Sequence, residues 1–438
     1  MCRNLIQPGP TELTTAAAGP QTEDQRLRYE AEMRKRHLFE ACKRGDSERV
    51  SKLLEDMSPL DLVDDPDSRM SLLHWASICG HAAVVELLIE AVAAAEERLA
   101  FIDLQDAGGC TALYYACQES RLEAAIVLLY FGARIAIEDN ASQAPFLCAF
   151  KRGSVLMMKF LIWFVVDVDE KDAQTGKSAL HYACNLDQLE VARLLLDRGA
   201  SVNLKDKKMQ SPIHIASEVG GVELTRVLLD RGASVNAQNK KRQSPLLIAA
   251  HAGNPVLARL LLDGGAMIDL QGSRLRSALH IASSRGHLEL AKLLIARGSN
   301  LNLRDVEGMS PRLLAASVER DAVVRQLLLN PDVELNRLDY HHRSALFLAC
   351  EIGAQQSVAL LLNHGAGVGL DGDRAYPLHS AISSGHCNIV ELLLDHTKAV
   401  RMRKGDDGCL LHRSCQVSRS YTCHTMCRNH DITARSRC

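Results

Sequence analysis

The sequence predicts an all-α solenoid, a stack of about eleven to twelve similar helix-turn-helix units from which hairpin fingers project. Three observations predict this fold class: one pattern of residues recurs every 33 or 34 positions, each copy contains two short apolar segments, and only 4% of the residues are aromatic. A unit of this length cannot bury its own apolar face, so neighbouring units must stack to form one continuous core.

Each copy begins with a similar short sequence, and the copies in the centre of the chain are the most regular. Ser178-Ala-Leu-His181-Tyr-Ala returns in the next copy as Ser211-Pro-Ile-His214-Ile-Ala. An insertion through Glu90–Asp106 separates the first two of the openings given below. With a capping copy that begins near His37, we count eleven full units and one broken unit. The openings are Ser71, Thr111, Ala144, Ser178, Ser211, Ser244, Ser277, Ser310, Ser344, Tyr376 and, incompletely, Cys409.

Within a unit, each element has a local physical cause. Ser followed by Pro, as in Ser211-Pro212, is an N-cap with proline at the first helical position, so the first helix begins there. The Leu-Leu-Leu block that follows is the apolar stripe of the second helix. A glycine then ends this helix in a left-handed conformation, and Val with Asn or Asp leads into the finger. These glycines are Gly199, Gly232, Gly265, Gly298 and Gly365.

The repeated line resembles the ankyrin repeat, whose signature is T-P-L-H-x-A with a later L-L-L-x-x-G-A. Ser211-Pro-Ile-His214-Ile-Ala and Val227-Leu-Leu-Asp-Arg-Gly232-Ala carry the resemblance in one copy, and it covers roughly residues 37–415. The resemblance implies a curved stack of helix pairs that recognises proteins through its finger tips and its concave face.

The fingers depart from this pattern at one position. A glycine is usual there, as at Gly109 and Gly308, but four fingers carry another residue. A residue other than glycine costs about 1 kcal/mol if the positive φ is kept. Either these fingers adopt a different turn, or the side chains at their tips make a contribution that offsets the strain. The four residues are Met209, Arg242, Leu275 and His342.

The histidines of the chain suggest a metal or catalytic site, but their placement favours a structural role. They all occupy one slot of the repeat, where ankyrin-like units use histidine for hydrogen bonds between neighbouring turns, and they do not converge as zinc ligands must. No phosphate-binding loop, nucleophile elbow or H-E-x-x-H motif is present. We therefore expect no enzyme activity, no cofactor and no metal. The histidines are His74, His181, His214, His280, His379 and His412.

Composition and the chain ends complete the domain prediction. The net charge is −2, no apolar run is long enough to span a membrane, and no secretory signal is present, so we expect a protein of the cytosol or nucleus. Residues 1–25 are predicted to be disordered, 26–415 to form the array, and 416–438 to be a basic, disordered tail. Cys423 and Cys427 in this tail lack a second well-spaced pair, which argues against zinc.

Basic side chains recur at the tips of consecutive fingers. Equivalent tips should lie about 8–10 Å apart, comparable to the Debye length of about 8 Å, so the charges reinforce one another. The alternative is ordinary solvated loop charge, and both readings stay open here. The candidate binding residues are Lys207, Lys208, Lys240, Lys241, Arg242, Arg274 and Arg276, flanked by Lys205 and Arg304.

Four aromatic residues fall on one corner of two adjacent repeats. Alignment on the Leu block places Tyr130 and Phe131, and then Trp163 and Phe164, in the slots that Asp197 and Arg198 fill later. Slots that are polar in most copies should face solvent, so these aromatics are candidate anchors for a partner. The alternative is that the Glu90–Asp106 insertion covers the corner.

These features predict a scaffold or adaptor that binds a protein, with an acidic segment as the favoured target, and breaks no bond. A rival is the substrate receptor of a ubiquitin ligase or the regulatory arm of a larger assembly, although no attached module such as a SOCS-type or BTB domain is found. Nucleic-acid binding ranks third, because the basic fingers lack interleaved aromatics and the chain is not basic overall. We expect neither a small-molecule substrate nor membrane insertion.

Overall fold

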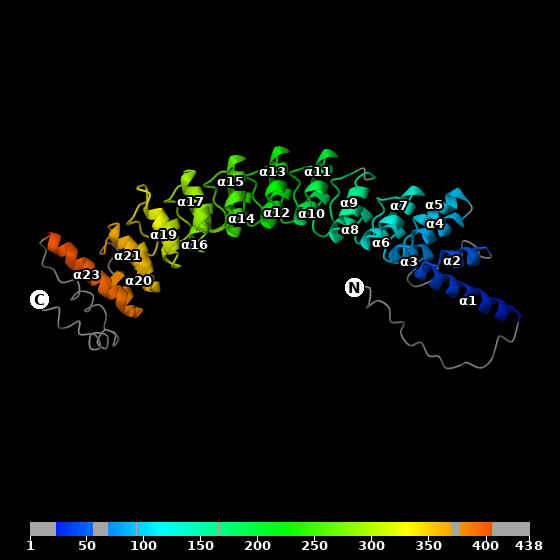
Figure 1. The fold of residues 1–438 in the computed structure, drawn as a ribbon, viewed down its shortest axis with the longest axis horizontal. Helices are drawn as coiled ribbons and strands as arrows, with labels where there is room; N and C mark the ends of the chain where they lie inside the picture. Colours follow the sequence, from blue (N-terminus) through cyan, green and yellow to red (C-terminus); the bar gives the residue numbers. More distant parts are fainter. Residues whose placement is uncertain (1–22, 56–68, 93, 165–166, 369–376, 405–438) are drawn as a thin grey trace, which may run out of the picture. The chain divides into compact units, whose positions relative to one another are not determined.

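The computed structural model describes residues 23–55, 69–92, 94–164, 167–368 and 377–404, and these form a succession of short helices (Figure 1). Eleven helix pairs and one additional helix, α5, account for the 23 α-helices of this described part. The predicted count of eleven full units is thus confirmed. The chain divides into two compact units, residues 1–182 and 183–438, which are described separately below.

The first compact unit contains four of the helix pairs and the additional helix. The first helices α3, α6 and α8 pack side by side, and the second helices form an outer layer in which α4 packs against α2 and α7. The helices are α1 (Glu23–Arg44), α2 (Ser47–Leu54), α3 (Leu72–Cys79), α4 (Ala82–Glu90), α5 (Ala95–Ile102), α6 (Ala112–Gln118), α7 (Leu122–Tyr130), α8 (Pro145–Arg152) and α9 (Val155–Leu161).

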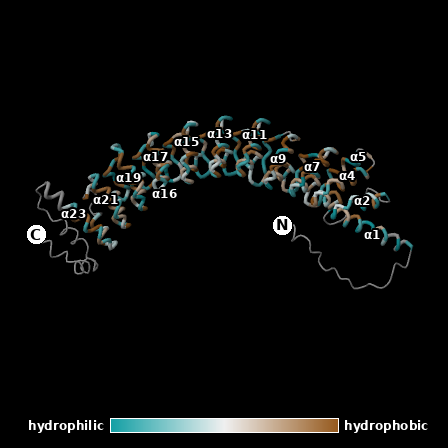
Figure 2. The backbone as a smooth tube through the Cα atoms, viewed as in Figure 1, coloured by the Kyte–Doolittle hydropathy of each residue, from teal (hydrophilic) through white to brown (hydrophobic). Residues whose placement is uncertain are grey.

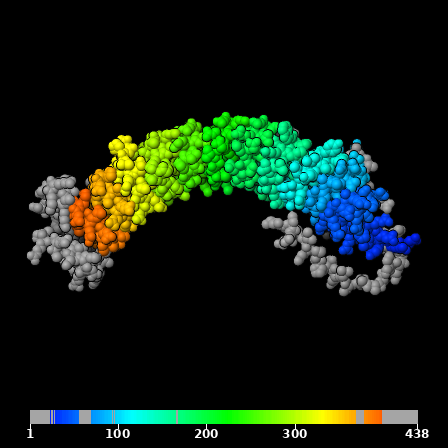
Figure 3. All heavy atoms as spheres, in the orientation of Figure 1, coloured from blue at the N-terminus to red at the C-terminus, as the bar shows by residue number. Residues whose placement is uncertain are grey.

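The second compact unit begins within α10 (Ala179–Asn185) and repeats the same arrangement, with inner helices α12 to α22 in one row and outer helices α11 to α23 in another (Figure 1). Its atoms form a continuous band that runs from green to orange in Figure 3. Its remaining helices are α11 (Leu189–Asp197), α12 (Pro212–Val219), α13 (Val222–Asp230), α14 (Pro245–Ala252), α15 (Pro255–Asp263), α16 (Ala278–Arg285), α17 (Leu288–Ala296), α18 (Pro311–Ala316), α19 (Asp321–Leu328), α20 (Ala345–Ile352), α21 (Gln355–Asn363), α22 (Pro377–Ser383) and α23 (Cys387–Lys404), with a 3-10 turn η2 (Ser273–Leu275).

A serine and a histidine hold the start of several inner helices, among them α3, α12 and α16. Ser211 caps α12, Pro212 occupies its first turn, and Nδ1 of His214 accepts a hydrogen bond from the Ser211 N–H at 3.1 Å. Nε2 of His214 lies 3.0 Å from the carbonyl oxygen of Ala237, so it must carry the proton and donate. His74 and His280 repeat this pattern, which confirms the structural role expected for these histidines.

The finger turns keep the left-handed backbone that the glycine pattern predicts. Met209, Arg242, Leu275 and His342 have φ values of 58°, 56°, 56° and 60°, close to 77° at Gly308. The fingers therefore do not turn differently; four of them retain a conformation that is costly for a residue with a Cβ atom. The five predicted helix-ending glycines are likewise left-handed, with φ between 80° and 86°.

All but one of the described finger turns are closed by an acidic or amide side chain. In the finger after α11, Oδ1 of Asp206 accepts hydrogen bonds from the N–H groups of Lys208 and Gln210, both at 2.8 Å. The equivalent side chains that close their own turns in this way are Asp106, Asp139, Asp172, Asn239, Asp305 and Asp339. Neighbouring fingers are joined by backbone hydrogen bonds, as from the Lys240 N–H to the Lys208 carbonyl oxygen at 3.0 Å.

The predicted boundaries can be compared with the structure at one end only. Helix α1 begins at Glu23, so the last three residues of the segment 1–25, predicted to be disordered, are helical. Residues 1–22, the incomplete last unit and the tail 416–438 lie outside the described residues. None of the described helices combines the length and apolar character needed to cross a membrane.

Candidate protein-binding surfaces

The outer helices α7 and α9 carry the four predicted aromatic anchors at or just beyond their carboxyl ends. Tyr130 is 84% exposed, Trp163 is 68% exposed and Phe164 is 44% exposed, whereas Phe131 is half-buried. The rings of Tyr130 and Phe131 meet edge to face with centroids 5.3 Å apart. The structure thus places large apolar side chains in solvent at slots that hold charged residues in most repeats.

Two further apolar residues, which were not predicted from the sequence, extend this surface. Leu156 occupies the slot of Glu190, and Ile126 occupies the slot of Arg193; both are exposed. Ile126 lies four residues before Tyr130 on α7, so the two side chains share one face of that helix. Leu156 lies on α9, and Trp163 follows the end of that helix. Comparison of all outward slots, instead of the aromatic ones alone, would have found them. The apolar sequence of both helices is visible in Figure 2, and we call Ile126, Tyr130, Phe131, Leu156, Trp163 and Phe164 the aromatic face.

The insertion between the second and third pairs folds as α5 beside the end of α7. Asp103, which follows α5, accepts hydrogen bonds from the Arg134 side chain at 2.7 Å and from its N–H at 2.9 Å. Leu99 of α5 lies so close to Gly132 that a Cβ atom built there would be 3.1 Å from Leu99 Cδ2. Yet Tyr130 and Trp163 remain mostly exposed. The alternative that the insertion buries this corner is therefore not what the structure shows for these two rings.

The basic finger residues occupy neighbouring turns in the second compact unit. Lys207 and Lys208 lie in one finger, Lys240, Lys241 and Arg242 in the next, and all five are exposed. Backbone hydrogen bonding between Lys240 and Lys208 brings these two tips together. We call these five residues, with Arg274 and Arg276, the basic finger row.

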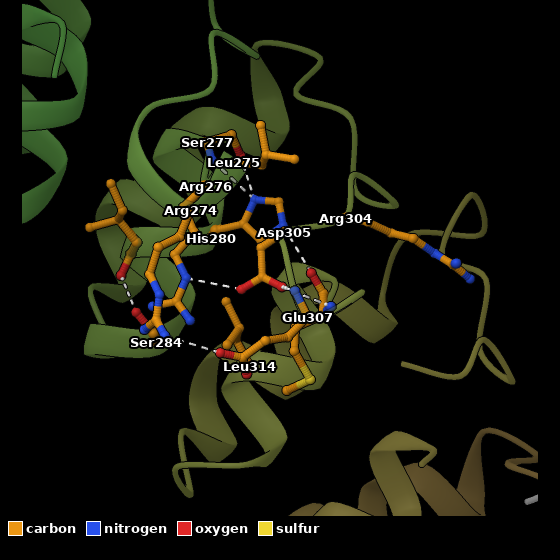
Figure 4. A network of polar contacts seen from close by, with 12 residues as sticks. Arg274, Leu275, Arg276, Ser277, His280, Ser284, Arg304, Asp305, Glu307 and Leu314 are labelled. Carbon is orange, nitrogen blue, oxygen red and sulfur yellow. Dashed lines mark hydrogen bonds and ion pairs between the residues drawn. The ribbon is translucent and has the colours of Figure 1, made fainter. Parts of the chain in front are cut away.

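At the carboxyl end of the basic finger row, the arginines form ion pairs with acidic side chains. Arg274 contacts Glu307 at 3.2 Å, and Arg276 contacts the fully buried carboxylate of Asp305 at 3.0 Å (Figure 4). Arg304 lies over the ring of Tyr340, 5.4 Å from its centroid. Lys240, Lys241 and Arg242 take part in none of the ion pairs formed among the described residues. The uncompensated positive charge is therefore greatest in the finger formed by residues 239–243.

Within the described part of the chain, no three His, Cys, Asp or Glu side chains are arranged to hold a metal ion. Burial lowers the pKa of His74, His214 and His280, and that of His280 falls to about 4. These rings are neutral hydrogen-bonding elements of the fold at neutral pH.

Comparison with known proteins gives one family and several partial relatives. An ankyrin repeat protein of Acanthamoeba polyphaga mimivirus is 26% identical over 167 residues, 38% of this chain and 21% of that protein. A protein of Oryza sativa subsp. japonica, named probable E3 ubiquitin-protein ligase XBOS32, is 28% identical over 195 residues, 38% of each chain. This chain thus spans well under two thirds of either relative.

One solved structure and the matching family model complete the comparison. The crystal structure of the human ASB11 ankyrin repeat domain is 26% identical, covers 49% of this chain and 97% of that chain, and has a TM-score of 0.45. The family model, ankyrin repeats in three copies, matches residues 38–139, 129–206, 146–239, 213–305 and 312–404.

Proposed function

Because this chain belongs to the ankyrin-repeat family, we propose that it is an adaptor that binds a partner protein through the aromatic face and the basic finger row. Ankyrin repeats generally mediate protein–protein interactions, and the proposal assigns that role to specific side chains. The partner is bound and released chemically unchanged, and the site of action is the cytosol or the nucleus.

The observation that carries the proposal is the exposure of the aromatic face. Tyr130 and Trp163 stand where Asp197, Asp230 and Asp263 stand in later repeats. A monomer seldom exposes clustered large apolar side chains, and Trp and Tyr are the residues most enriched among binding hot spots. Burial of these rings by a partner would remove apolar surface from water at about 25 cal/mol per Å².

The basic finger row supports an acidic segment as the second part of the target. Exposed like charges on neighbouring tips create a local positive potential, although the chain as a whole is nearly neutral. Charge complementarity of this kind mainly accelerates association and selects among partners. Salt should therefore slow binding through the finger row much more than binding through the aromatic face.

The experiment begins with proximity labelling by the intact chain, followed by association kinetics with the recovered partner at low and high salt. Changing Lys207, Lys208, Lys240, Lys241 and Arg242 to Ser should slow association about tenfold at low salt and flatten its salt dependence. The matched control changes five exposed basic residues of the outer helices to Ser and removes the same charge. Equal effects of the two variants would show that net charge, and not the finger row, governs association. The control residues are Arg193, Arg226, Arg259, Lys292 and Arg325.

A second candidate is the substrate receptor of a ubiquitin ligase, which the similarity to the rice protein favours. Both candidates predict partner binding, but only this one predicts that the recovered partner becomes ubiquitinated in a manner that depends on Tyr130 and Trp163. Nucleic-acid binding ranks third; competition of nucleic acid with the protein partner at physiological salt would favour it instead.

A further inference from the structure

One finger of the second compact unit lacks the side chain that closes the others. At the position of Asp206, Asn239, Asp305 and Asp339, the finger before α16 has Gly272. A Cβ atom at Gly272 would lie 2.8 Å from the Arg242 carbonyl oxygen and 2.7 Å from Leu247 Cδ1. The close approach of the preceding finger thus excludes Asp or Asn, and the oxygen that closes the other turns is missing here.

A cavity of about 220 Å³ opens beside Gly272, between the inner helices α14 and α16. At about 30 Å³ per molecule, this volume corresponds to roughly seven waters, enough for a side-chain carboxylate and its methylene groups. Its walls carry three cationic side chains, and none of its lining residues is acidic. The lining includes His251, Gly272, Arg274, Arg276, Ser284 and Arg285.

The arginines of this cavity are held in place by the fold. Arg276 binds the buried carboxylate of Asp305, and Arg274 binds Glu307 of the next finger (Figure 4). Nη1 of Arg285 donates to the carbonyl oxygen of His251 at 3.2 Å. Burial, with help from Arg285 and Arg276, lowers the pKa of His251, so this imidazole is neutral and the positive potential comes from the guanidinium groups.

The backbone of this finger is more strained than that of the others. Arg274 and Leu275 both have positive φ, 58° and 56°, and they are the one pair of consecutive left-handed residues with side chains among the described residues. Each such residue costs about 1 kcal/mol. Strain of this kind persists where surrounding contacts over-determine it and is concentrated at ligand sites. Here it points the Arg274 side chain to the cavity wall.

An equivalent position of the first compact unit shows what such a site can hold. The carboxylate of Asp172 closes its own finger and contacts Nζ of Lys151 at 2.8 Å, with the Tyr182 hydroxyl as a further donor. Lys151 occupies the slot of His251. The repeat can therefore build a carboxylate-binding environment at this point. In the finger of Gly272 the slots of Lys151 and Tyr182 hold His251 and Ile281, and the cationic groups come instead from Arg274, Arg276 and Arg285.

We propose that this cavity, beside the finger of Gly272, binds the side-chain carboxylate of an aspartate or glutamate of the partner. The inference rests on the proposed function and adds a defined subsite to it. The guanidinium groups of Arg276 and Arg285 donate hydrogen bonds to the carboxylate oxygens, and Arg274 covers the entrance. A singly charged carboxylate is favoured over a phosphate because Asp305 and Glu307 already balance two of the three arginines.

The test uses the full chain and a fluorescein-labelled peptide with four glutamates separated by glycine and serine, measured by fluorescence polarisation. Arg285→Gln removes one donor, and Ser284→Phe fills the cavity while leaving all three arginines in place. Each variant should weaken peptide binding about tenfold, as expected for loss of one charge-assisted contact. Arg259→Gln, on the outer helix α15, removes the same charge elsewhere and should leave binding unchanged.

Each outcome bears on the inference separately from the proposed function. Undiminished binding by Ser284→Phe and Arg285→Gln, with loss of binding in the five-residue finger variant, would overturn the cavity and leave the adaptor function standing. A matched glutamine peptide that binds equally well, or a phosphoserine peptide that binds more tightly, would overturn the carboxylate assignment. Circular dichroism of both cavity variants verifies that they fold.

Discussion

Arg312 donates a hydrogen bond from Nη2 to the backbone carbonyl oxygen of Glu334 at 2.7 Å, although its side chain is only 1% exposed. A second nitrogen of the same guanidinium donates to the carbonyl oxygen of Leu335. The slot of Arg312 holds Leu180, Ile213 and Leu279 in other repeats, all of them in the core. One unit of the array therefore carries a buried cation where the fold elsewhere has a hydrocarbon.

Arg312→Leu should raise the free energy of unfolding by about 1–2 kcal/mol. The substitution removes the desolvation penalty of the charge, and the two carbonyl groups it abandons lie near the surface, where water can reach them. Arg312→Ala should instead lower stability by about 2 kcal/mol or more, because it leaves a cavity. Urea denaturation measures both; a leucine variant less stable than the wild type would show that the carbonyl hydrogen bonds outweigh desolvation.

Stability should fall as the pH drops below 6.5. The pKa of His280 is lowered to about 4 in the folded state, so between pH 6.5 and 4 the unfolded chain binds a proton that the folded chain does not. His280 alone should lower the free energy of unfolding by roughly 2 kcal/mol between pH 7.5 and 5. His280→Leu, which introduces the residue found at Leu247 and Leu313 in the same slot, should be less stable at pH 7.5 but less sensitive to pH. An unchanged pH dependence in this variant would contradict the assignment.

Met209→Gly should stabilise the protein by up to about 1 kcal/mol, since it relieves a left-handed residue at a finger tip. Lys208→Gly, one residue earlier and without a positive φ, should destabilise it by a similar amount through the greater backbone freedom of the unfolded chain. Thermal melts of the two variants compare these effects directly. Equal destabilisation by both would mean that the Met209 side chain makes packing contacts worth more than its strain.

Tyr130→Ser with Trp163→Ser should leave stability almost unchanged and abolish recovery of the partner. Exposed side chains contribute little to folding, whereas aromatic hot spots at interfaces contribute about 2 kcal/mol or more to binding. Asp197→Ser with Asp230→Ser alters the same slots of later repeats and should retain the partner. A large drop in melting temperature with the partner retained would identify the aromatic face as core.

Deletion of residues 211–243 should leave a folded, shorter protein. The deletion removes α12 and α13 as one whole repeat and joins Gln210 to Ser244 in register, so the inner and outer rows can close again. Circular dichroism should show the same helicity per residue as in the full chain. Loss of most of the helical signal would contradict the view that each repeat is stabilised by its neighbours.

The repeat sequence predicted the elements whose causes are local. Ser211 and Pro212 begin a helix, as predicted. For the turns at Met209 and His342 the sequence left two alternatives open, and the structure has the left-handed one that the glycines of other fingers adopt. The exposure of Tyr130 also followed from the polarity of its slot in other copies. In each case the residues at one position of a repeat indicate the conformation or exposure of the same position in another repeat. A single globular domain has no such internal copies for comparison.

Features that depend on contacts between fingers were not predicted. Arg274 adopts a left-handed backbone beside Leu275, in a finger where Gly272 lies tightly against the Arg242 carbonyl group. The cavity combines this finger with His251 and Arg285 from two inner helices, and no periodicity reveals that convergence. The clue in the sequence was a single glycine in a slot of Asp and Asn.

The self-closed finger turns have a consequence for the sequence of a partner. Because Asp206 and Asn239 close their own turns and the Lys240 N–H joins the two fingers, the spacing between adjacent tips does not depend on what binds them. Helix packing sets that spacing at about 8–10 Å, and a polyproline II segment has three residues per turn and advances about 3.1 Å per residue. A partner segment that runs along the tips in this conformation thus presents every third side chain to a basic tip, so its acidic residues should follow a three-residue period.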